Sequence, residues 1–259
     1  MEIIKKNIPK FIKNFINIIF KRKIKLEGSF NNWNEALSNS NGYDNSLIFN
    51  KTIKSFEKVI KKEASFERDS VLFHNDLPDK DLISIIRNLY KHNNINICDF
   101  GGSLASSYFQ NINFLNQKKF IWNVIEQKKY VDYAKKNLHI PNLNFFTNVD
   151  FLLKKKIDLV IFSSVLQYLK SPYILLNKIT KKKIKNIIIC RTPFSDQTET
   201  IKIQIVPKHI YSASYPVRIF DNKKLIKYMS DRNYKIKKKF QTNETIDGIN
   251  YKGYFFIRA

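Results

Sequence analysis

The chain has 259 residues and a mass of 30.7 kDa, which is enough for one α/β domain with a well-buried core. Its net charge is +24, from 46 basic and 22 acidic residues, but only 7 of the basic residues are arginine. Proteins that bind phosphates rely on the planar fork of arginine, so this lysine excess favours a solvated surface over nucleic acid binding. A negatively charged substrate or membrane surface is the alternative.

The two cysteines, Cys98 and Cys190, fall in predicted core strands. We expect small buried apolar groups there and no disulfide or metal ligand, which fits the reducing cytoplasm. Zinc-type spacing of Cys and His is absent from the sequence, and we expect no metal site.

Residues 8–25 carry apolar side chains at helical spacing with lysines opposite and a basic cluster behind. The segment is too polar to span a bilayer and lacks a small-residue cleavage site. Two interpretations stay open: a helix packed on the domain, or a basic amphipathic helix on an anionic membrane at the inner face of the cell.

Residues 27–44 are polar and rich in turn residues, which predicts irregular backbone with one short helical turn near Trp33. Residues 47–62 have the spacing of an amphipathic helix. Residues 66–73 follow, and Asp79 then caps a helix that runs to Tyr90.

Residues 95–106 read Ile-Asn-Ile-Cys-Asp-Phe-Gly-Gly-Ser-Leu-Ala-Ser, a short buried strand that ends in a tight turn and a helix. Such a turn presents backbone N–H groups at the carboxyl end of a parallel strand, where open α/β sheets bind ligands. Residues 119–126 form a second strand that ends at Glu126, whose carboxylate is suited to accept hydrogen bonds from both hydroxyls of a ribose.

Further strands are predicted at 143–146, 156–163 and 184–190, each a continuous apolar run typical of a sheet covered on both faces. Residues 191–216 are poor in charge and contain several prolines, which favours a substrate pocket wall over an ordinary crossover insertion. A helix at 221–232 and a hairpin formed by 234–240 and 251–257 complete the sheet.

Together these motifs resemble class I S-adenosylmethionine-dependent methyltransferases. More narrowly, five stretches resemble the methyltransferases often encoded in bacterial surface-polysaccharide gene clusters: Asp99 to Leu104, Trp122 to Gln127, Ser163 to Leu169, Arg191 to Phe194, and Ser214 to Pro216. The resemblance implies an α/β, doubly wound, mostly parallel seven-stranded Rossmann-like sheet with a C-terminal antiparallel hairpin. Residues 1–92 would form an N-terminal helical extension and cap, and residues 93–259 the S-adenosylmethionine-binding domain.

The resemblance also implies roles for individual residues. Residues expected to contact the cofactor are Asp99, Gly101, Gly102, Ser103, Glu126, Gln127, Asn148, Ser163 and Ser164. Tyr43 is a candidate to close on the cofactor, although it and Trp33 are as well explained as anchors of their segment. Arg68 is a candidate to grip the methionine carboxylate, with a salt bridge to Asp69 or Glu67 as the alternative.

Expected acceptor-binding residues are Gln167, Tyr168, Arg191, Tyr211 and Tyr215. His209 is the candidate base, and Arg191 and Tyr215 are further catalytic candidates. The expected activity is methyl transfer to a small-molecule or saccharide-type acceptor. A catalytically silent cofactor-binding module is the alternative, while a nicotinamide dehydrogenase is disfavoured because Ser103 and Ser106 break the Gly-x-Gly-x-x-Gly spacing.

The turn departs from the family pattern in one respect. Many class I methyltransferases carry three alternating glycines after the first strand, whereas this chain has Gly101, Ser103 and Ala105. Side chains therefore stand where bare backbone is usual, and we expect a turn of different shape or weaker cofactor binding.

Overall fold

A computed structural model describes residues 24–41, 45–75, 77–90, 94–152, 154–207 and 210–259. Most of the amphipathic segment 8–25, together with Tyr43 and His209, lies outside the described residues. No helix within the described ranges combines the length and apolarity needed to cross a membrane.

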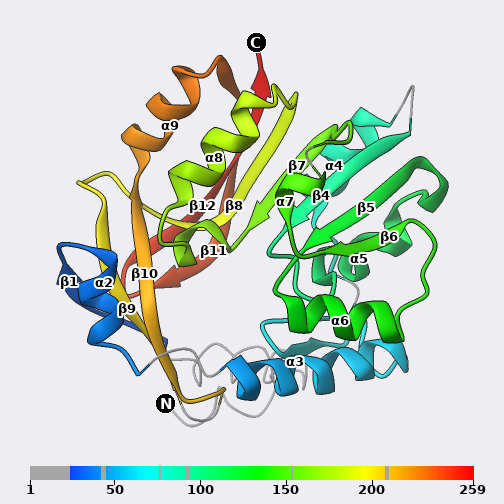
Figure 1. The fold of residues 1–259 in the computed structure, drawn as a ribbon, viewed down its shortest axis with the longest axis horizontal. Helices are drawn as coiled ribbons and strands as arrows, with labels where there is room; N and C mark the ends of the chain where they lie inside the picture. The colour runs from blue at the N-terminus through cyan, green and yellow to red at the C-terminus, as the bar shows by residue number, and fades with distance from the viewer. Residues whose placement is uncertain (1–23, 42–44, 76, 91–93, 153, 208–209) are drawn as a thin grey trace, which may run out of the picture.

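The centre of the molecule is a parallel sheet of five strands in the order β6-β5-β4-β7-β8 (Figure 1). Their bounds are Ile95–Phe100 for β4, Phe120–Ile125 for β5, Leu143–Phe146 for β6, Leu159–Ser163 for β7 and Asn186–Ser195 for β8. The antiparallel hairpin of β11 (Tyr234–Ile246) and β12 (Ile249–Arg258) extends the sheet, because β12 pairs with β8. The predicted α/β class and the C-terminal hairpin are confirmed.

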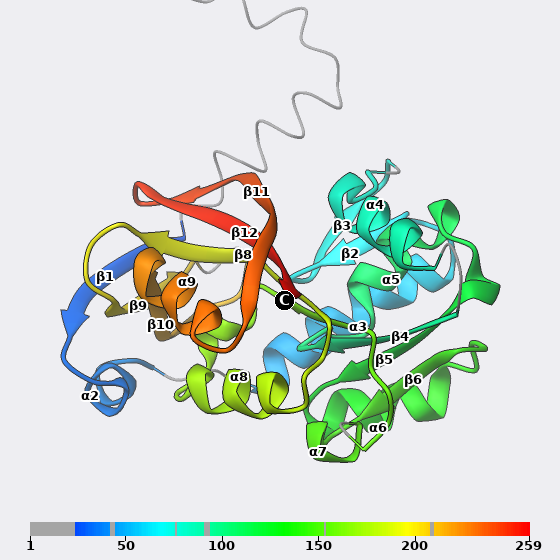
Figure 2. The same cartoon turned by 90° about the horizontal axis from the view of Figure 1, so that it is seen from above.

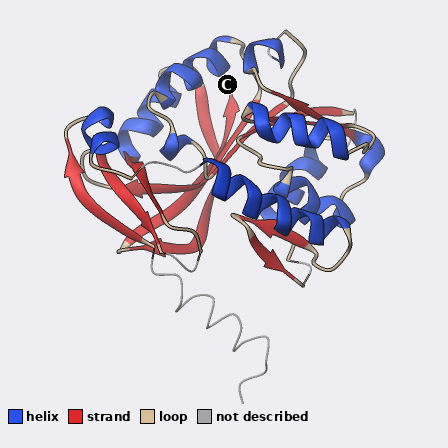
Figure 3. Ribbon diagram, turned by 60° about the horizontal axis from the view of Figure 1, so that its bottom comes forward, coloured by secondary structure: helices blue, strands red, loops and turns tan. Residues whose placement is uncertain are grey.

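Helices cover both faces of this sheet (Figure 3). Helices α3 (Asn45–Ile60), α4 (Lys80–Leu89), α5 (Ser106–Asn111) and α6 (Lys128–Asn137) pack on one face around Trp122. Helices α7 (Val149–Leu152), α8 (Pro172–Lys181) and α9 (Asn222–Ser230) pack on the other around Phe162. Both side chains are fully buried, since each strand buries alternate residues on opposite faces.

Within the residues that the structure describes, strand β8 connects two parts of one ten-stranded sheet. Its first half, Asn186 to Cys190, pairs with β7, whereas Phe194 and Ser195 pair with β10 (Ala213–Asp221). Strand β9 (Thr200–Val206) lies antiparallel to β10, and β1 (Lys25–Phe30) completes this second part, called here the added sheet, at its edge. The chain therefore builds a second, antiparallel wall from the end of β8 (Figure 2).

The prediction of irregular backbone at 27–44 is wrong for residues 27–30, which lie in a strand, whereas the predicted helical turn near Trp33 is confirmed. Residues 25–30 form β1, and α2 (Trp33–Ser38) follows it and packs on β9 and β10. The helix thus rests on the added sheet and not over β4 and β5 (Figure 1). Local pattern failed here because the partner strand β9 lies far downstream, and Gly28 sits within β1 at φ +70°.

A small hairpin of β2 (Phe66–Arg68) and β3 (Val71–Phe73) precedes α4. Its turn residues Asp69 and Ser70 both have positive φ, as a two-residue hairpin turn of type I′ requires. The Ser70 hydroxyl lies 3.1 Å from that of Thr52, and Ser55 donates to the Ser70 carbonyl at 2.8 Å. These contacts fix the hairpin, called here the β2/β3 hairpin, to helix α3.

Candidate functional site

The turn after β4 has three alternate residues in the left-handed region. Gly101, Ser103 and Ala105 have φ values of +72°, +54° and +68°. The backbone therefore keeps the alternation that three glycines would allow, although two positions carry side chains. Each such non-glycine residue costs roughly 1–2 kcal/mol, which indicates that the surrounding structure holds the turn in place.

This turn lies tightly against its neighbours. A Cβ atom on Gly101 would lie 2.4 Å from Cγ2 of Val165, which follows β7, so the turns after β4 and β7 are in contact. The Gly101 N–H donates to the Ile125 carbonyl at 2.9 Å. A Cβ on Gly102 would lie 2.7 Å from the Asp99 carboxylate. Close approach, and not only turn geometry, requires glycine at both positions.

Asp99 lies beneath the turn and is 1% exposed. Its carboxylate accepts a hydrogen bond from Nε1 of Trp122 at 3.1 Å. Burial raises the pKa of Asp99 to about 7; the bond from Trp122 opposes this shift, and the nearby charge of Glu126 adds to it. Asp99 is therefore placed to support the turn from below.

Glu126 lies at the tip of β5, directly beside the turn. One carboxylate oxygen accepts from the backbone N–H of Ser103 at 3.2 Å, and the other accepts from that of Gln127 at 2.8 Å. Burial raises the pKa of Glu126, while these two hydrogen bonds lower it. The ends of β4 and β5 thus converge, as the sequence predicted.

The remaining cofactor candidates lie at the ends of the neighbouring strands. Asn148 follows β6, and its side-chain oxygen accepts from the Asp150 N–H at 2.7 Å. Ser163 ends β7, and Ser164, with φ +55°, donates its N–H to the Cys190 carbonyl at 3.0 Å. The ends of β7 and β8 are therefore joined next to the turn after β4.

Gln167 connects the two segments that follow β7 and β8. Its amide nitrogen donates to the Ser164 hydroxyl at 3.0 Å and to the Arg191 carbonyl at 3.3 Å. Because a carbonyl can only accept, the bond to Arg191 fixes the orientation of the amide. The side chain is completely buried, and its carbonyl oxygen finds no hydrogen-bond donor among the described residues.

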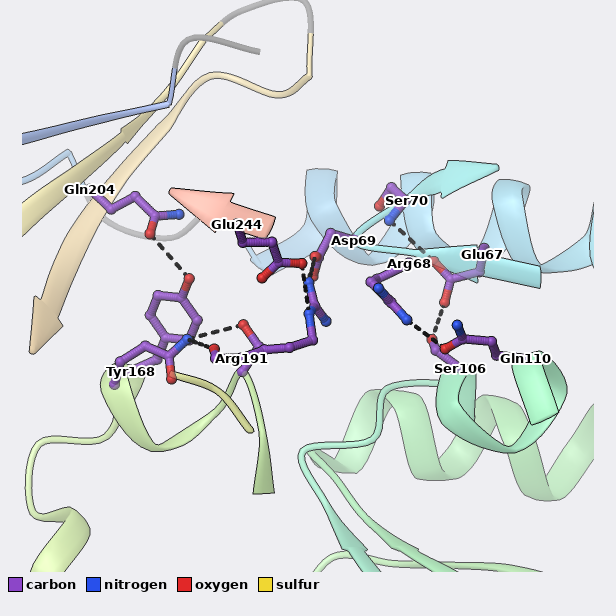
Figure 4. Close-up of polar contacts among 12 residues, drawn as sticks. Glu67, Arg68, Asp69, Ser70, Ser106, Gln110, Tyr168, Arg191, Gln204 and Glu244 are labelled. Carbon is purple, nitrogen blue, oxygen red and sulfur yellow. Dashed lines mark hydrogen bonds and ion pairs between the residues drawn. The ribbon is translucent and has the colours of Figure 1, made fainter. Parts of the chain in front are cut away.

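Two tyrosines and a glutamine link this region to the added sheet, and Figure 4 shows two of them, Tyr168 and Gln204. The Tyr168 hydroxyl donates to Oε1 of Gln204 at 3.1 Å, and Nε2 of Gln204 donates to the Tyr215 hydroxyl at 3.0 Å. Burial raises the pKa of Tyr168. Tyr211 is buried beside Tyr168 and Ile48 of α3. The three tyrosines that were predicted to bind the methyl acceptor therefore lie in one cluster.

The β2/β3 hairpin lies across the edge of the candidate site, with contacts on both sides (Figure 4). Glu67 accepts from the Ser106 hydroxyl at the start of α5 and from the Ser70 N–H. Burial raises the pKa of Glu67 to about 7. Arg68 donates to Gln110 of α5 and, among the described residues, forms no ion pair, so the predicted alternative of a salt bridge to Glu67 or Asp69 is wrong.

Arg191 lies where β8 passes from the central sheet to the added sheet, at φ +51°. Its Nε donates to Glu244 of β11 at 2.9 Å, and its Nη2 donates to Asp69 of the hairpin turn at 3.3 Å (Figure 4). Burial alone would lower the pKa of Arg191, but the two carboxylates raise it above its ordinary value. Arg191, a residue of the central sheet, therefore forms ion pairs with both the β2/β3 hairpin and the C-terminal hairpin.

Sequence reasoning missed Glu67, Asp69, Gln204 and Glu244 as members of the site. The one local signal was the run Glu67-Arg68-Asp69 between two short apolar stretches, which is typical of a charged hairpin turn. Gln204 and Glu244 lie within strands that become neighbours of the site only through long-range pairing.

No family model and no curated protein sequence matches this chain. Solved structures of low sequence identity share the fold. The N-terminal domain of EvdMO1 with S-adenosylhomocysteine bound is 14% identical, with 84% of this chain and 98% of that chain covered and a TM-score of 0.52. The glycopeptide N-methyltransferase MtfA with S-adenosylmethionine is 8% identical, with 70% and 95% covered and a TM-score of 0.52. These neighbours are methyltransferases or cofactor-bound domains with the class I fold.

Proposed function

We propose that this protein is an S-adenosylmethionine-dependent methyltransferase that acts on a small-molecule or saccharide-type acceptor. The observation that carries the proposal is the convergence of the turn after β4 with Glu126 at the tip of β5. Structures of the same fold that hold S-adenosylmethionine or S-adenosylhomocysteine support the choice of cofactor.

The side chains present fit this cofactor. The Glu126 carboxylate has about four lone-pair positions and uses two on backbone N–H groups, which leaves acceptors for the two ribose hydroxyls. Arg68, a cation without a carboxylate partner among the described residues, would bind the methionine carboxylate. Gln127 and Asn148 would lie beside the adenine, and Gly101 and Ser103 beside the methionine. When bound, the cofactor supplies an electrophilic methyl group on a sulfonium.

The protein's own task is then to position the acceptor and remove one proton. Gln167, Tyr168 and Tyr215 would bind the acceptor by hydrogen bonds, and Tyr211 would pack against it. His209, outside the described residues, remains the candidate base. A sugar acceptor gains support from EvdMO1, whose structure was also determined in the presence of D-fucose. A role in surface-polysaccharide synthesis follows from the sequence resemblance.

The test combines titration calorimetry with a turnover assay. We expect S-adenosylmethionine and S-adenosylhomocysteine to bind the full chain and NAD not to bind. Transfer of a labelled methyl group to neutral glycosides or glycan extracts would support the enzyme. Cofactor binding without turnover on any acceptor would favour the silent binding module, and absence of cofactor binding would refute the proposal.

A further inference from the structure

The polar groups expected to contact the methyl acceptor mostly accept hydrogen bonds. Those expected to contact the cofactor, called here the cofactor side, include the donor Arg68. The acceptor side, defined here as Gln167, Tyr168, Arg191, Asp69 and Glu244, is built from segments far apart in the sequence (Figure 4). Gln167 donates to the Arg191 carbonyl, and the Arg191 side chain contacts Asp69 and Glu244, so these groups lie in one neighbourhood. Its chemistry can therefore be considered as that of one binding surface.

The buried carbonyl oxygen of Gln167 calls for a donor. Oε1 is fully buried without a donor among the described residues, and an unsatisfied buried acceptor costs about 1–3 kcal/mol. The amide cannot turn to relieve this, because its nitrogen already serves the Arg191 carbonyl and the Ser164 hydroxyl. An O–H or N–H group of a ligand would satisfy it.

Tyr168 likewise offers a hydrogen-bond acceptor. Its hydroxyl proton is donated to Gln204, so the phenolic oxygen meets any further partner as an acceptor. The side chain of Asp69 is 62% exposed and that of Glu244 is 39% exposed, and a carboxylate can only accept. Four residues on the acceptor side thus offer hydrogen-bond-accepting oxygen atoms to an incoming methyl acceptor.

The single cation on this side is already compensated. Arg191 is only 17% exposed and faces two carboxylates, so the group of three carries one net negative charge. Arg68, the other cation of Figure 4, donates to Gln110 of α5. Burial lowers its pKa, and the charges of Glu244 and Asp69 act to raise it. In the proposed complex the methionine carboxylate of the cofactor would compensate its charge. The carboxylate or phosphate of a charged methyl acceptor would meet repulsion at Asp69 and Glu244, and that anionic group could not itself donate a hydrogen bond to Gln167.

We infer that the methyl acceptor is an uncharged molecule rich in hydroxyl donors, such as a neutral sugar ring, and not an anionic sugar or a phosphorylated one. This inference rests on the proposed function, because it treats the surface beside the cofactor as the acceptor site. It makes Gln167 a specificity-determining residue, and it makes the Asp69 and Glu244 pair a filter against anions.

The experiment compares two probes that differ in one group: methyl β-D-glucopyranoside and the glucuronide in which a carboxylate replaces its CH₂OH. Saturation-transfer NMR on the full chain, loaded with S-adenosylhomocysteine, measures both in one mixture. We expect several-fold stronger saturation of the neutral glycoside. Equal or stronger saturation of the glucuronide, or no saturation of either, would overturn the inference.

Two variants sharpen the result. Gln167→Leu should weaken saturation of the neutral glycoside. The double variant Asp69→Asn with Glu244→Gln frees the charge of Arg191 and should shift the preference towards the glucuronide. The exposed pair Glu63→Gln with Asp231→Asn removes the same charge elsewhere and should leave the preference unchanged. An unchanged preference in the Asp69 and Glu244 variant would contradict the filter.

Calorimetry separates this inference from the proposed function. Each variant is first titrated with S-adenosylhomocysteine, which also reports whether it is folded. If the wild-type chain does not bind that ligand, the proposed function fails. If it binds and the glucuronide is still preferred, only the inference on the acceptor fails.

Discussion

Arg68 and Arg191 both lie beside the turn of the β2/β3 hairpin, yet their hydrogen-bond partners differ (Figure 4). Arg68 forms no ion pair among the described residues. Burial and the charge of Arg191 lower its pKa, and the more distant carboxylates of Glu244, Asp69 and Asp79 oppose this shift only in part. Arg191 is held by Asp69 and Glu244, and its pKa is raised despite burial. An uncompensated guanidinium suits an anionic ligand group, while a compensated one suits a structural joint. The cofactor side therefore provides a positive charge, and the acceptor side provides hydrogen-bond acceptors and negative charge.

The largest expected loss of stability comes from a change at Gly101, where the turn after β4 contacts the segment after β7. Gly101→Ala places a Cβ at φ +72° and 2.4 Å from Val165, so we expect a loss of about 2–5 kcal/mol in unfolding free energy and loss of cofactor binding. Gly248→Ala is the matched control, because its φ of +76° carries the same backbone cost but nothing lies within 4 Å. Thermal denaturation and calorimetry measure both. Equal effects of the two changes would show that close approach at Gly101 is unimportant.

Glu67 gives the next largest effect, and it depends on pH. Burial is the main cause that raises its pKa from the ordinary 4.5 of a glutamate to about 7 in the folded state. The folded protein therefore holds this proton more tightly than the unfolded chain. The contribution to stability is fully present below about pH 4.5 and is lost as pH rises through about 7.

Glu67→Gln should remove this dependence. We expect the variant to be more stable than wild type above pH 7, by at most about 3 kcal/mol, with a smaller change in unfolding free energy between pH 4.5 and 7. Urea denaturation across this range provides the measurement, and the exposed Glu63→Gln variant is the control. A variant that follows the wild-type pH profile would show that Glu67 does not titrate in this window.

Arg68→Met tests the cofactor side alone. The affinity for S-adenosylhomocysteine should fall about tenfold to a hundredfold, because the charge-assisted hydrogen bond from Arg68 to the carboxylate of this ligand is lost. The affinity for 5′-methylthioadenosine, which lacks that carboxylate, should hardly change. Arg87→Met, which alters an exposed arginine that donates to the Phe114 carbonyl, is the control. If both ligands lose affinity equally, Arg68 does not bind the carboxylate.

Gln204→Leu alters the hydrogen-bond partner of Tyr168 on the acceptor side and has the smallest expected effect. It removes the amide partner of Tyr168 and Tyr215, so we expect unfolding free energy to fall by about 1–2 kcal/mol. Titration with S-adenosylhomocysteine should give the wild-type affinity, because Gln204 contacts neither the turn after β4 nor Glu126. The exposed Gln197→Leu variant should be neutral. Weakened cofactor binding in Gln204→Leu would mean that the two sides are coupled.

The comparison of the two sides also explains what the sequence could predict. Strands β4 to β7, the capped helix α4 and the C-terminal hairpin depend on local pattern, and each was expected near its observed position. Glu126 was predicted beside the turn for the same reason, since the carboxyl ends of parallel strands meet at one edge.

The acceptor side depends on contacts that no local pattern encodes. Arg191 was predicted to bind substrate, but its ion pairs reach Asp69 and Glu244, which lie 122 and 53 positions away. Strand β1 escaped prediction because its hydrogen-bonding partner is β9. The left-handed residues Ser103 and Ala105 show the converse: side chains in place of glycines predicted a turn of different shape, yet both residues adopt the left-handed backbone that glycine would allow.

The pairing of β1 with β9 has a consequence for synthesis of the chain. Residues 25–30 leave the ribosome long before residues 200–206, so β1 has no partner until most of the protein has been made. The parallel strands β4 to β7 can assemble in the meantime, since all of them precede β9. Closure of the antiparallel wall is therefore a late folding step, and the nascent polypeptide must keep an unpaired amino-terminal edge from associating with other chains.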